Sequence, residues 1–289
     1  MFANLFGKYL ISKGILTEDG FLCAKMQLNK TRVKLGLIAV SERLMDEKDA
    51  DKVNFRQQVI DKKFGDIAVE MGLLSKPQVE RLLTLQGNPY MTFCQCLVDK
   101  ELMTLAEIEE ALINFQKENG FTQTDMEAIK SGDVDRIMPL FLPPLPDGPI
   151  YDLIGVTFRC LNRLASEDIC VEKGYTTSNY QSGAIAIQEI FGDYNARMAF
   201  TGDDKGILAI AEAFAKEFFN EVDVNALDSV GEFINISNGL FATAKSREGM
   251  ELNLKPPVLS KEPMELSGST ILVIPLEINE QKLDWLIIL

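Results

Sequence analysis

A 29-residue repeat constrains the fold of the N-terminal part more than any other feature of the sequence. Each copy of the repeat starts with an apolar residue, which is followed directly by glycine or cysteine. A pair of apolar residues comes nine to ten positions after that first residue. The four copies start at Phe6, Leu35, Phe64 and Phe93. We interpret each copy as a helix, a tight turn and a second helix. Because one such pair cannot bury its own apolar face, neighbouring pairs must stack.

Residues that cap helices support this interpretation. Each apolar pair is followed by a side chain that can accept a hydrogen bond from the first turn of a helix. These residues are Thr17, Asp46, Ser75 and Thr104. The last two also start capping boxes, because Gln78 and Glu107 stand three residues further along the chain. The sequence therefore predicts an all-α array of four helix pairs in residues 1–117.

The repeat unit resembles the helical-pair modules at the N-termini of type II secretion and pilus ATPases, some of which bind cyclic di-GMP. The resemblance is carried by the segments KLGLIAVSERLMDEKDADKVNFRQQ and KFGDIAVEMGLLSKPQVERLLTLQ. The nucleotide-binding modules have an arginine before the Leu-Gly pair, whereas the matching positions here are Lys34 and Lys63. The resemblance leaves two alternatives for the repeats, a cyclic di-GMP site or an interaction scaffold without a small ligand.

A proline-rich segment separates the repeats from the rest of the chain. The helical periodicity stops over residues 118–149, and the eleven residues from Pro139 to Pro149 include five prolines. Prolines at this density exclude a regular helix or a central strand. We expect a short helix within residues 124–138, followed by a stiff and extended connector. The predicted organisation is a repeat domain, a linker over 118–149 and a second domain over 150–289.

Composition excludes several classes of function. The formal net charge of −14 argues against non-specific binding of nucleic acid and against docking on anionic membranes. The chain contains no histidine, so neither a histidine-based catalytic dyad nor a histidine-ligated metal site can form within it. Its five cysteines are scattered, which is typical of thiols in a reducing cytosol. With no apolar run of membrane-spanning length, we expect a cytoplasmic protein without membrane insertion, resident metal or cofactor.

The order of the expected elements in residues 150–289 predicts an α+β domain. Strands come first, two amphipathic helices next and strands last, which favours an antiparallel sheet with long helices on one face. We expect helices over 151–165, 206–218 and 225–249, and strands over 168–172, 183–190, 196–201, 250–254, 269–278 and 283–289. The last strand, LDWLIIL, is apolar on both faces. It is therefore either central in the sheet or covered by a partner.

The long helix over 225–249 carries the candidate site. At helical spacing, one arc is apolar and packs inward. That arc holds Leu227, Val230, Phe233, Ile234, Leu240, Phe241 and Ala244. The other arc carries two acidic residues, an amide and then small residues. It holds Asp228, Glu232, Asn235, Gly239, Ala242 and Ser246. Arg247 and Gly249 are typical of a helix end, and Pro256 and Pro257 follow.

This pattern resembles the CheX/CheC/FliY family of chemotaxis phosphatases, and most closely its CheX branch. In that family an acidic or serine residue precedes a glutamate, an asparagine follows after two residues, and a proline lies about twenty residues downstream. Asp228, Glu232, Asn235 and one of the two prolines match this order. The downstream gap is one or two residues shorter here, and the family's Asn-Met-x-x-Gly-Asn is replaced by NISNGLF. A second Glu-x-x-Asn at 217–220 is interpreted as a helix end beside a buried Phe218.

The resemblance implies a reaction and roles for the residues. The reaction is hydrolysis of the aspartyl phosphate on a CheY-like response regulator, which itself brings Mg²⁺ and a lysine. Asn235 would orient the attacking water, and Glu232 would pair with the regulator's lysine. Asp228 would extend this contact or serve only as an acid near the start of the helix. Asn238 and Gly239 would belong to the binding surface.

Two further expectations follow from the resemblances. The CheX-like half implies a homodimer. The alternatives to a phosphatase are non-catalytic signalling adaptors. One would bind a response regulator without hydrolysing its phosphate, and the other would bind cyclic di-GMP through the repeats.

Overall fold

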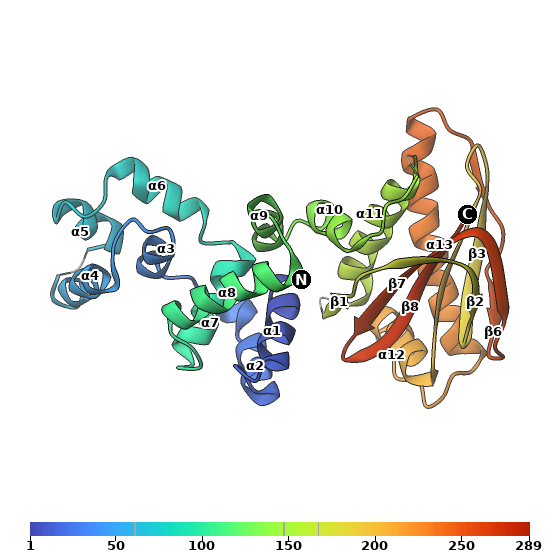
Figure 1. Ribbon diagram of the computed structural model, residues 1–289, viewed down its shortest axis with the longest axis horizontal. Helices are drawn as coiled ribbons and strands as arrows, with labels where there is room; N and C mark the ends of the chain where they lie inside the picture. The colour runs from blue at the N-terminus through green and yellow to red at the C-terminus, as the bar shows by residue number, and fades with distance from the viewer. Residues whose placement is uncertain (61, 147, 167) are drawn as a thin grey trace. The chain divides into compact units, whose positions relative to one another are not determined.

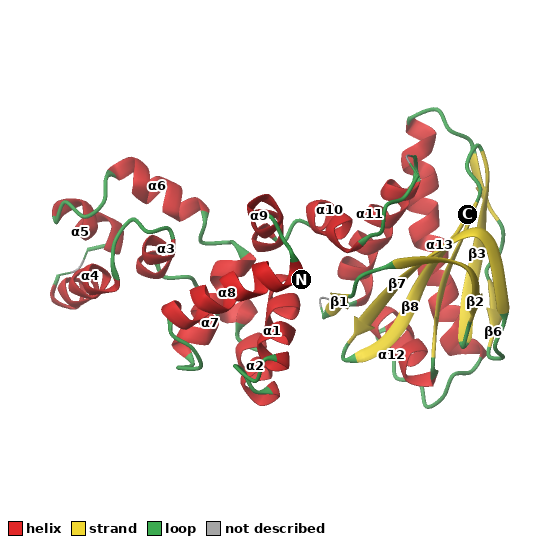
Figure 2. Cartoon of the chain, viewed as in Figure 1, coloured by secondary structure: helices red, strands yellow, loops and turns green. Residues whose placement is uncertain are grey.

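The computed structural model describes residues 1–60, 62–146, 148–166 and 168–289. The chain divides into two compact units, Phe2–Gly132 and Asp133–Leu289 (Figure 1). Among the described residues, the first unit contains helices joined by loops and no strand, and the second combines helices with a sheet (Figure 2). Within the described ranges, no helix is both long enough and apolar enough to cross a lipid bilayer.

The first unit consists of short helices joined by tight turns. They are α1 (Phe2–Ser12), α2 (Glu18–Lys25), η1 (Leu28–Lys30), α3 (Leu35–Ser41), α4 (Glu47–Val59), α5 (Phe64–Glu70), α6 (Lys76–Thr84), α7 (Pro89–Asp99), α8 (Leu105–Asn119) and α9 (Gln123–Ser131). Helix α1 contacts α2, α7, α8 and α9, whereas α3 contacts α4, α5 and α6. Helices α1 and α2 therefore form one group with α7, α8 and α9. Helices α3 to α6, which lie between them in the sequence, form a second group.

Glycines and caps explain the close helix contacts in this unit. A Cβ on Gly7 would lie 2.1 Å from the ring of Phe21, and one on Gly65 would lie 2.6 Å from Val79. Only a residue without a side chain lets α1 approach α2, and α5 approach α6, this closely. The cap of α8 is a capping box, in which the Thr104 N–H donates to the Glu107 carboxylate at 2.7 Å.

The segment predicted as a linker is divided between the two units. Helix α9 lies in the first unit, whereas α10 (Val134–Ile137) and η2 (Met138–Phe141) lie in the second. Part of the proline-rich stretch is therefore helical, because Pro139 stands in the first turn of η2, where its missing N–H costs nothing. Phe141 is buried, and its carbonyl accepts from the Gly174 N–H at 2.7 Å. Asp147 of this segment lies outside the described residues.

The second unit confirms the predicted α+β class with an antiparallel sheet. Its further elements are α11 (Ile150–Cys160), η3 (Leu161–Ala165), β1 (Ile169–Val171), β2 (Tyr175–Gln181), β3 (Ala184–Gly192), β4 (Ala196–Gly202), α12 (Asp204–Ala215), α13 (Val224–Arg247), β5 (Leu252–Leu254), β6 (Val258–Ser260), β7 (Glu265–Ile278) and β8 (Gln281–Ile288). The strands follow the order β1-β7-β8-β4-β3-β5, with β2 added to β7 and β6 added to β3. Helices α11, α12 and α13 lie on one side of the sheet (Figure 2).

The central place of β8 explains its apolar sequence. It lies between β7 and β4, where Trp285 pairs with Ile274 on one side and with Phe200 on the other. On the helix side, the Trp285 ring stacks on Phe200. On the other side, Leu286 belongs to a buried cluster that also includes Leu266 from the start of β7. Of the two alternatives for this strand, the central position holds.

Several local predictions for this unit are wrong. Phe218 is 79% exposed, because α12 ends at Ala215, Lys216 caps it in a left-handed conformation, and the chain leaves the helical arc there. Leu240 is 41% exposed, because the second half of α13 buries Phe241 and Lys245 instead. Strands β2 and β6 were not predicted at all. Both run along existing strands of the sheet, and their own sequences are too polar or too short to reveal them.

Candidate functional site

The candidate site is built on α13, whose two ends are well defined. The Asp223 carboxylate caps the start of the helix by accepting from the Ala226 N–H at 2.9 Å. This backbone hydrogen bond lowers the pKa of Asp223 below its ordinary value. The helix ends at Arg247, and Gly249 follows with a φ of +90°. One continuous helix therefore carries all the predicted site residues.

Aromatic packing fixes which side of α13 remains uncovered. Phe233 is fully buried, and its ring lies edge-on to Phe200 at 5.6 Å and to Phe214 at 5.7 Å. Because Phe233 points into the core, Glu232 points outward and is exposed. Asn235, one turn further along the helix, is half-buried at the edge of the same surface.

The amide of Asn235 is tied to the sheet by a residue that the sequence interpretation missed. Gln188 of β3 donates from Nε2 to Asn235 Oδ1 at 2.8 Å, and also to the Lys255 carbonyl at 2.8 Å. Asn238 donates from Nδ2 to Gln188 Oε1, again at 2.8 Å. Its own Oδ1 is buried without a partner among the described residues. Three amides thus form a chain from the core to the edge of the site.

The other predicted binding residues lie in different environments. Asp228 is exposed, on the same side of the helix as Glu232. Gly239 faces open space, since no atom lies within 4 Å of the position that its Cβ would occupy. Asn238 is 0% exposed, so its predicted place on the binding surface is wrong. Its side chain faces β3, because its spacing from the buried Ile234 and Phe241 keeps it on the inner face of the helix.

Of the two prolines after the helix, Pro257 lies close to it at the site. A Cβ on Gly231 would lie 3.3 Å from Pro257 Cβ and 3.0 Å from Leu259 Cδ2. Gly231 therefore lets the segment between β5 and β6 pass close to the helix, one residue before Glu232. This segment also supplies the Lys255 carbonyl that binds Gln188.

The site contains a carboxylate and an amide without any metal-binding cluster. Among the described residues, no group of three or more carboxylate or thiol side chains is placed to hold a metal ion. An amide can donate and accept hydrogen bonds at the same time, but it cannot take up a proton at neutral pH. Asn235 can therefore hold a water molecule by hydrogen bonds but cannot act as its general base.

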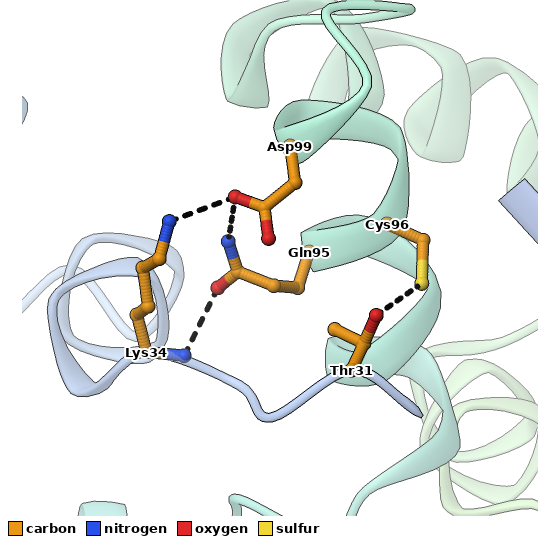
Figure 3. A network of polar contacts seen from close by, with 5 residues as sticks. All are labelled: Thr31, Lys34, Gln95, Cys96 and Asp99. Atoms are coloured by element: carbon orange, nitrogen blue, oxygen red, sulfur yellow. Dashed lines mark hydrogen bonds and ion pairs between the residues drawn. The ribbon is translucent and has the colours of Figure 1, made fainter. Parts of the chain in front are cut away.

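The two lysines that match the cyclic di-GMP modules differ in their surroundings. The Lys34 ammonium binds the Asp99 carboxylate at 2.8 Å, and its backbone N–H donates to Gln95 Oε1 at 3.0 Å (Figure 3). Gln95 Nε2 in turn donates to Asp99 at 2.9 Å. These contacts tie the start of α3 to α7 and place a carboxylate beside the exposed Lys34 ammonium. Lys63 is exposed at the start of α5.

A comparison with protein families identifies the segment that carries this geometry. The family described as chemotaxis phosphatase CheX matches residues 184–277, which include Gln188, Glu232 and Asn235. Residues 184–277 form a CheX family domain. The match to the CheX family does not extend into the first unit. No protein with a curated function matches the sequence.

Several solved structures are similar to the part of the chain that contains the CheX domain. CheX from Desulfovibrio desulfuricans is 19% identical, with a TM-score of 0.41 over 48% of this chain and 97% of that one. The CheX–CheY–BeF3–Mg²⁺ complex from Borrelia burgdorferi contains a chain that is 18% identical, with a TM-score of 0.41 over 48% and 96%. FliY from Thermotoga maritima is 17% identical, with a TM-score of 0.33 over 47% and 81%.

Proposed function

We propose that the second unit is a phosphatase that accelerates hydrolysis of the aspartyl phosphate of a CheY-like response regulator. One observation carries this proposal. Glu232 and Asn235 lie a helical turn apart at the uncovered side of α13, within the segment that matches the CheX family. A CheY is also the partner named in the Borrelia burgdorferi complex. A regulator substrate also implies the cytoplasmic location that the sequence predicts.

The chemistry requires little from the phosphatase. An aspartyl phosphate is an activated acyl phosphate, and the regulator supplies the Mg²⁺ and the lysine that stabilise its charge. Hydrolysis breaks the bond between phosphorus and the aspartyl oxygen as a water molecule attacks from the opposite side. The missing component is a water held in line, and an amide can hold it by hydrogen bonds without itself exchanging a proton. Asn235 supplies that amide.

Glu232 supplies the docking contact. Its exposed carboxylate is free to approach the regulator's lysine, and an ion pair that becomes desolvated between two proteins favours one orientation of the partner. Asp228 extends the acidic surface by one turn. Gly239 leaves open space beyond Asn235, which lets the partner surface come close to the helix.

The first unit is proposed as an interaction scaffold made of four helix pairs. A scaffold fits the observation that Lys34 already has a carboxylate partner, Asp99, although this exposed ion pair would oppose a nucleotide phosphate only weakly. Calorimetry with cyclic di-GMP tests this choice, and heat that disappears in a Lys34→Ala Lys63→Ala variant would support the nucleotide site instead. The CheX resemblance also leads us to propose a homodimer, which light scattering on the full chain would detect.

The direct test is phosphate release from a response regulator that has been phosphorylated with acetyl phosphate. We expect the chain to accelerate release, and Asn235→Ala to reduce the acceleration roughly 10²-fold because the water loses its positioning. Asn220→Ala is the matched control, since it alters the second Glu-x-x-Asn, which lies after the end of α12. Unchanged release with the wild-type chain would refute the proposal. If the regulator still bound, a non-catalytic adaptor would be the remaining interpretation.

A further inference from the structure

The three amides behind the site form a chain with a defined direction. Gln188 is 1% exposed and lies between Asn235 and Asn238, with hydrogen bonds of 2.8 Å to both. These hydrogen bonds link residues that are far apart in the sequence, since 47 positions separate Gln188 from Asn235 and 67 separate it from Lys255. Only the folded unit brings them together.

The Lys255 carbonyl determines which end of each amide faces which neighbour. A backbone carbonyl can only accept, so the Gln188 atom at 2.8 Å from it must be Nε2. The second proton of this amino group is donated to Asn235, which must therefore turn Oδ1 inward. The Nδ2 group of Asn235 then points away from Gln188. The remaining lone pair of Oδ1 can still accept a proton from water.

We propose that Gln188 is a positioning residue that holds the Asn235 amide in the orientation needed for the reaction. This role rests on the proposed function. With Oδ1 held, the outward Nδ2 donates to a phosphoryl oxygen, and the free lone pair of Oδ1 accepts from the attacking water. Gln188 is buried and does not itself touch the substrate. Its contribution is preorganisation, because an amide that rotated freely would have to be ordered at each encounter.

Asn238, the buried end of the row of three amides, supports this role. Asn238 is fully buried and donates to Gln188, yet its own Oδ1 has no partner among the described residues. An unsatisfied buried polar atom destabilises the folded state. An apolar residue at this position would avoid this destabilisation. However, it would leave Gln188 Oε1 without a donor and the Gln188 amide without its third contact.

The sharpest test is Gln188→Glu, which keeps the shape of the side chain and replaces its donor with an acceptor. At a pH where the new carboxyl group is ionised, it cannot donate to Asn235 Oδ1, so Asn235 must rotate and turn Nδ2 inward. We expect kcat for regulator dephosphorylation to fall about tenfold or more, as expected for a misplaced catalytic group, with KM unchanged. Gln188→Met, which can neither donate nor accept in this way, should lose activity to a similar extent.

The pH profile separates positioning from a loss of structure. Burial raises the pKa of a carboxyl group, and its protonated form has an O–H that can donate to Asn235 Oδ1. Relative to the wild type at each pH, Gln188→Glu should therefore recover activity as the pH falls, whereas Gln188→Met should not. Equal kcat in wild type and Gln188→Glu, or a loss confined to KM, would overturn the assignment.

A readout without the regulator keeps this inference distinct from the proposed function. In nuclear magnetic resonance spectra of the full chain, the side-chain amide protons of Asn235 should exchange rapidly with solvent in the wild type. In Gln188→Glu they should be protected, because Nδ2 now faces inward. Protected Asn235 protons in the wild type would contradict the orientation. If the wild type lacks phosphatase activity but shows this exchange pattern, the proposed function fails while the amide geometry stands.

Discussion

Phe233 is the residue whose packing decides that Glu232 and Asn235 face outward, and its replacement tests that reasoning. Its ring is fully buried and contacts two other rings edge-on, Phe200 at 5.6 Å and Phe214 at 5.7 Å. Phe233→Ala would remove the ring from between a strand of the sheet and a second helix. Both neighbours belong to regular elements, so the surrounding structure can collapse into the cavity only in part.

The magnitude follows from the loss of burial and of the ring contacts. Replacing a buried phenylalanine by alanine costs about 3–5 kcal/mol, and this figure includes the cavity. Each edge-to-face pair contributes roughly 0.5–1.5 kcal/mol beyond its buried area. With two such pairs, we expect a loss in the free energy of unfolding of about 4 kcal/mol. Phe233→Leu keeps most of the volume and should lose about 1–2 kcal/mol, mainly from the aromatic pairs.

Fluorescence measures this loss in the second unit alone. The chain contains a single tryptophan, Trp285, which is fully buried against Phe200. Unfolding of the full chain in urea, followed by this signal, should give a midpoint lower by about 2 M for Phe233→Ala at a typical slope of about 2 kcal/mol per M. Phe218→Ala is the control, because that exposed ring should change stability by less than about 0.5 kcal/mol.

A small loss of stability for Phe233→Ala together with a large loss for Phe218→Ala would contradict this packing. That outcome would mean that Phe218, as its sequence pattern suggested, is the buried ring. Helix α13 would then have to be rotated or shifted, and Glu232 and Asn235 would no longer share an uncovered surface. If Phe233→Ala does not fold at all, Phe233→Leu still provides the comparison.

Two further predictions use the same fluorescence assay. The Lys245 ammonium binds Asp152 and Glu248, and the hydrogen bond to Asp152 raises the Lys245 pKa above 10.5. Because the folded-state pKa is raised, the stabilisation should be complete below about pH 10.5 and lost as the pH rises through the folded-state value. Lys245→Met should therefore lower the free energy of unfolding by about 1 kcal/mol at pH 7, a modest loss because both carboxylates are exposed. A loss of the same size at high pH would contradict this prediction. A Cβ on Gly206 would lie 2.1 Å from the Lys282 carbonyl oxygen, so Gly206→Ala should cost about 1–3 kcal/mol. Gly239→Ala, which meets no atom within 4 Å, should instead be neutral or stabilising by up to about 1 kcal/mol.

The sequence predicted the first half of α13 better than the second, for a physical reason. Leu227, Val230, Phe233 and Ile234 are buried as the apolar arc required. Beyond them the buried positions include Ser237, Asn238 and Lys245, whose polar groups are mostly satisfied by partners in the fold. A hydrophobicity pattern cannot identify a buried lysine whose charge is balanced by Asp152, a residue from another helix.

Gln188 shows why part of the candidate site lay beyond the sequence. Its only signal was that, next to Glu189, it is one of the two polar residues in the strand segment AIAIQEI. Its partners come from α13 and from the segment before β6, so its role depends on tertiary contacts alone. Glu232 and Asn235, by contrast, belong to one helix, and their shared side follows from helical spacing. Local patterns could therefore predict the surface of the site but not the amides behind it.

Whether Asn235 takes part in the reaction itself is decided by measuring binding and turnover separately. A response regulator carrying beryllium fluoride in place of its phosphoryl group would be titrated with wild-type chain and with Asn235→Ala. The same regulator, phosphorylated, would then be mixed with a saturating amount of each chain. We predict affinities within threefold of each other and a dephosphorylation rate roughly 10²-fold lower for Asn235→Ala. Equal rates at saturation would contradict the account, because Asn235 would then contribute nothing to the reaction itself.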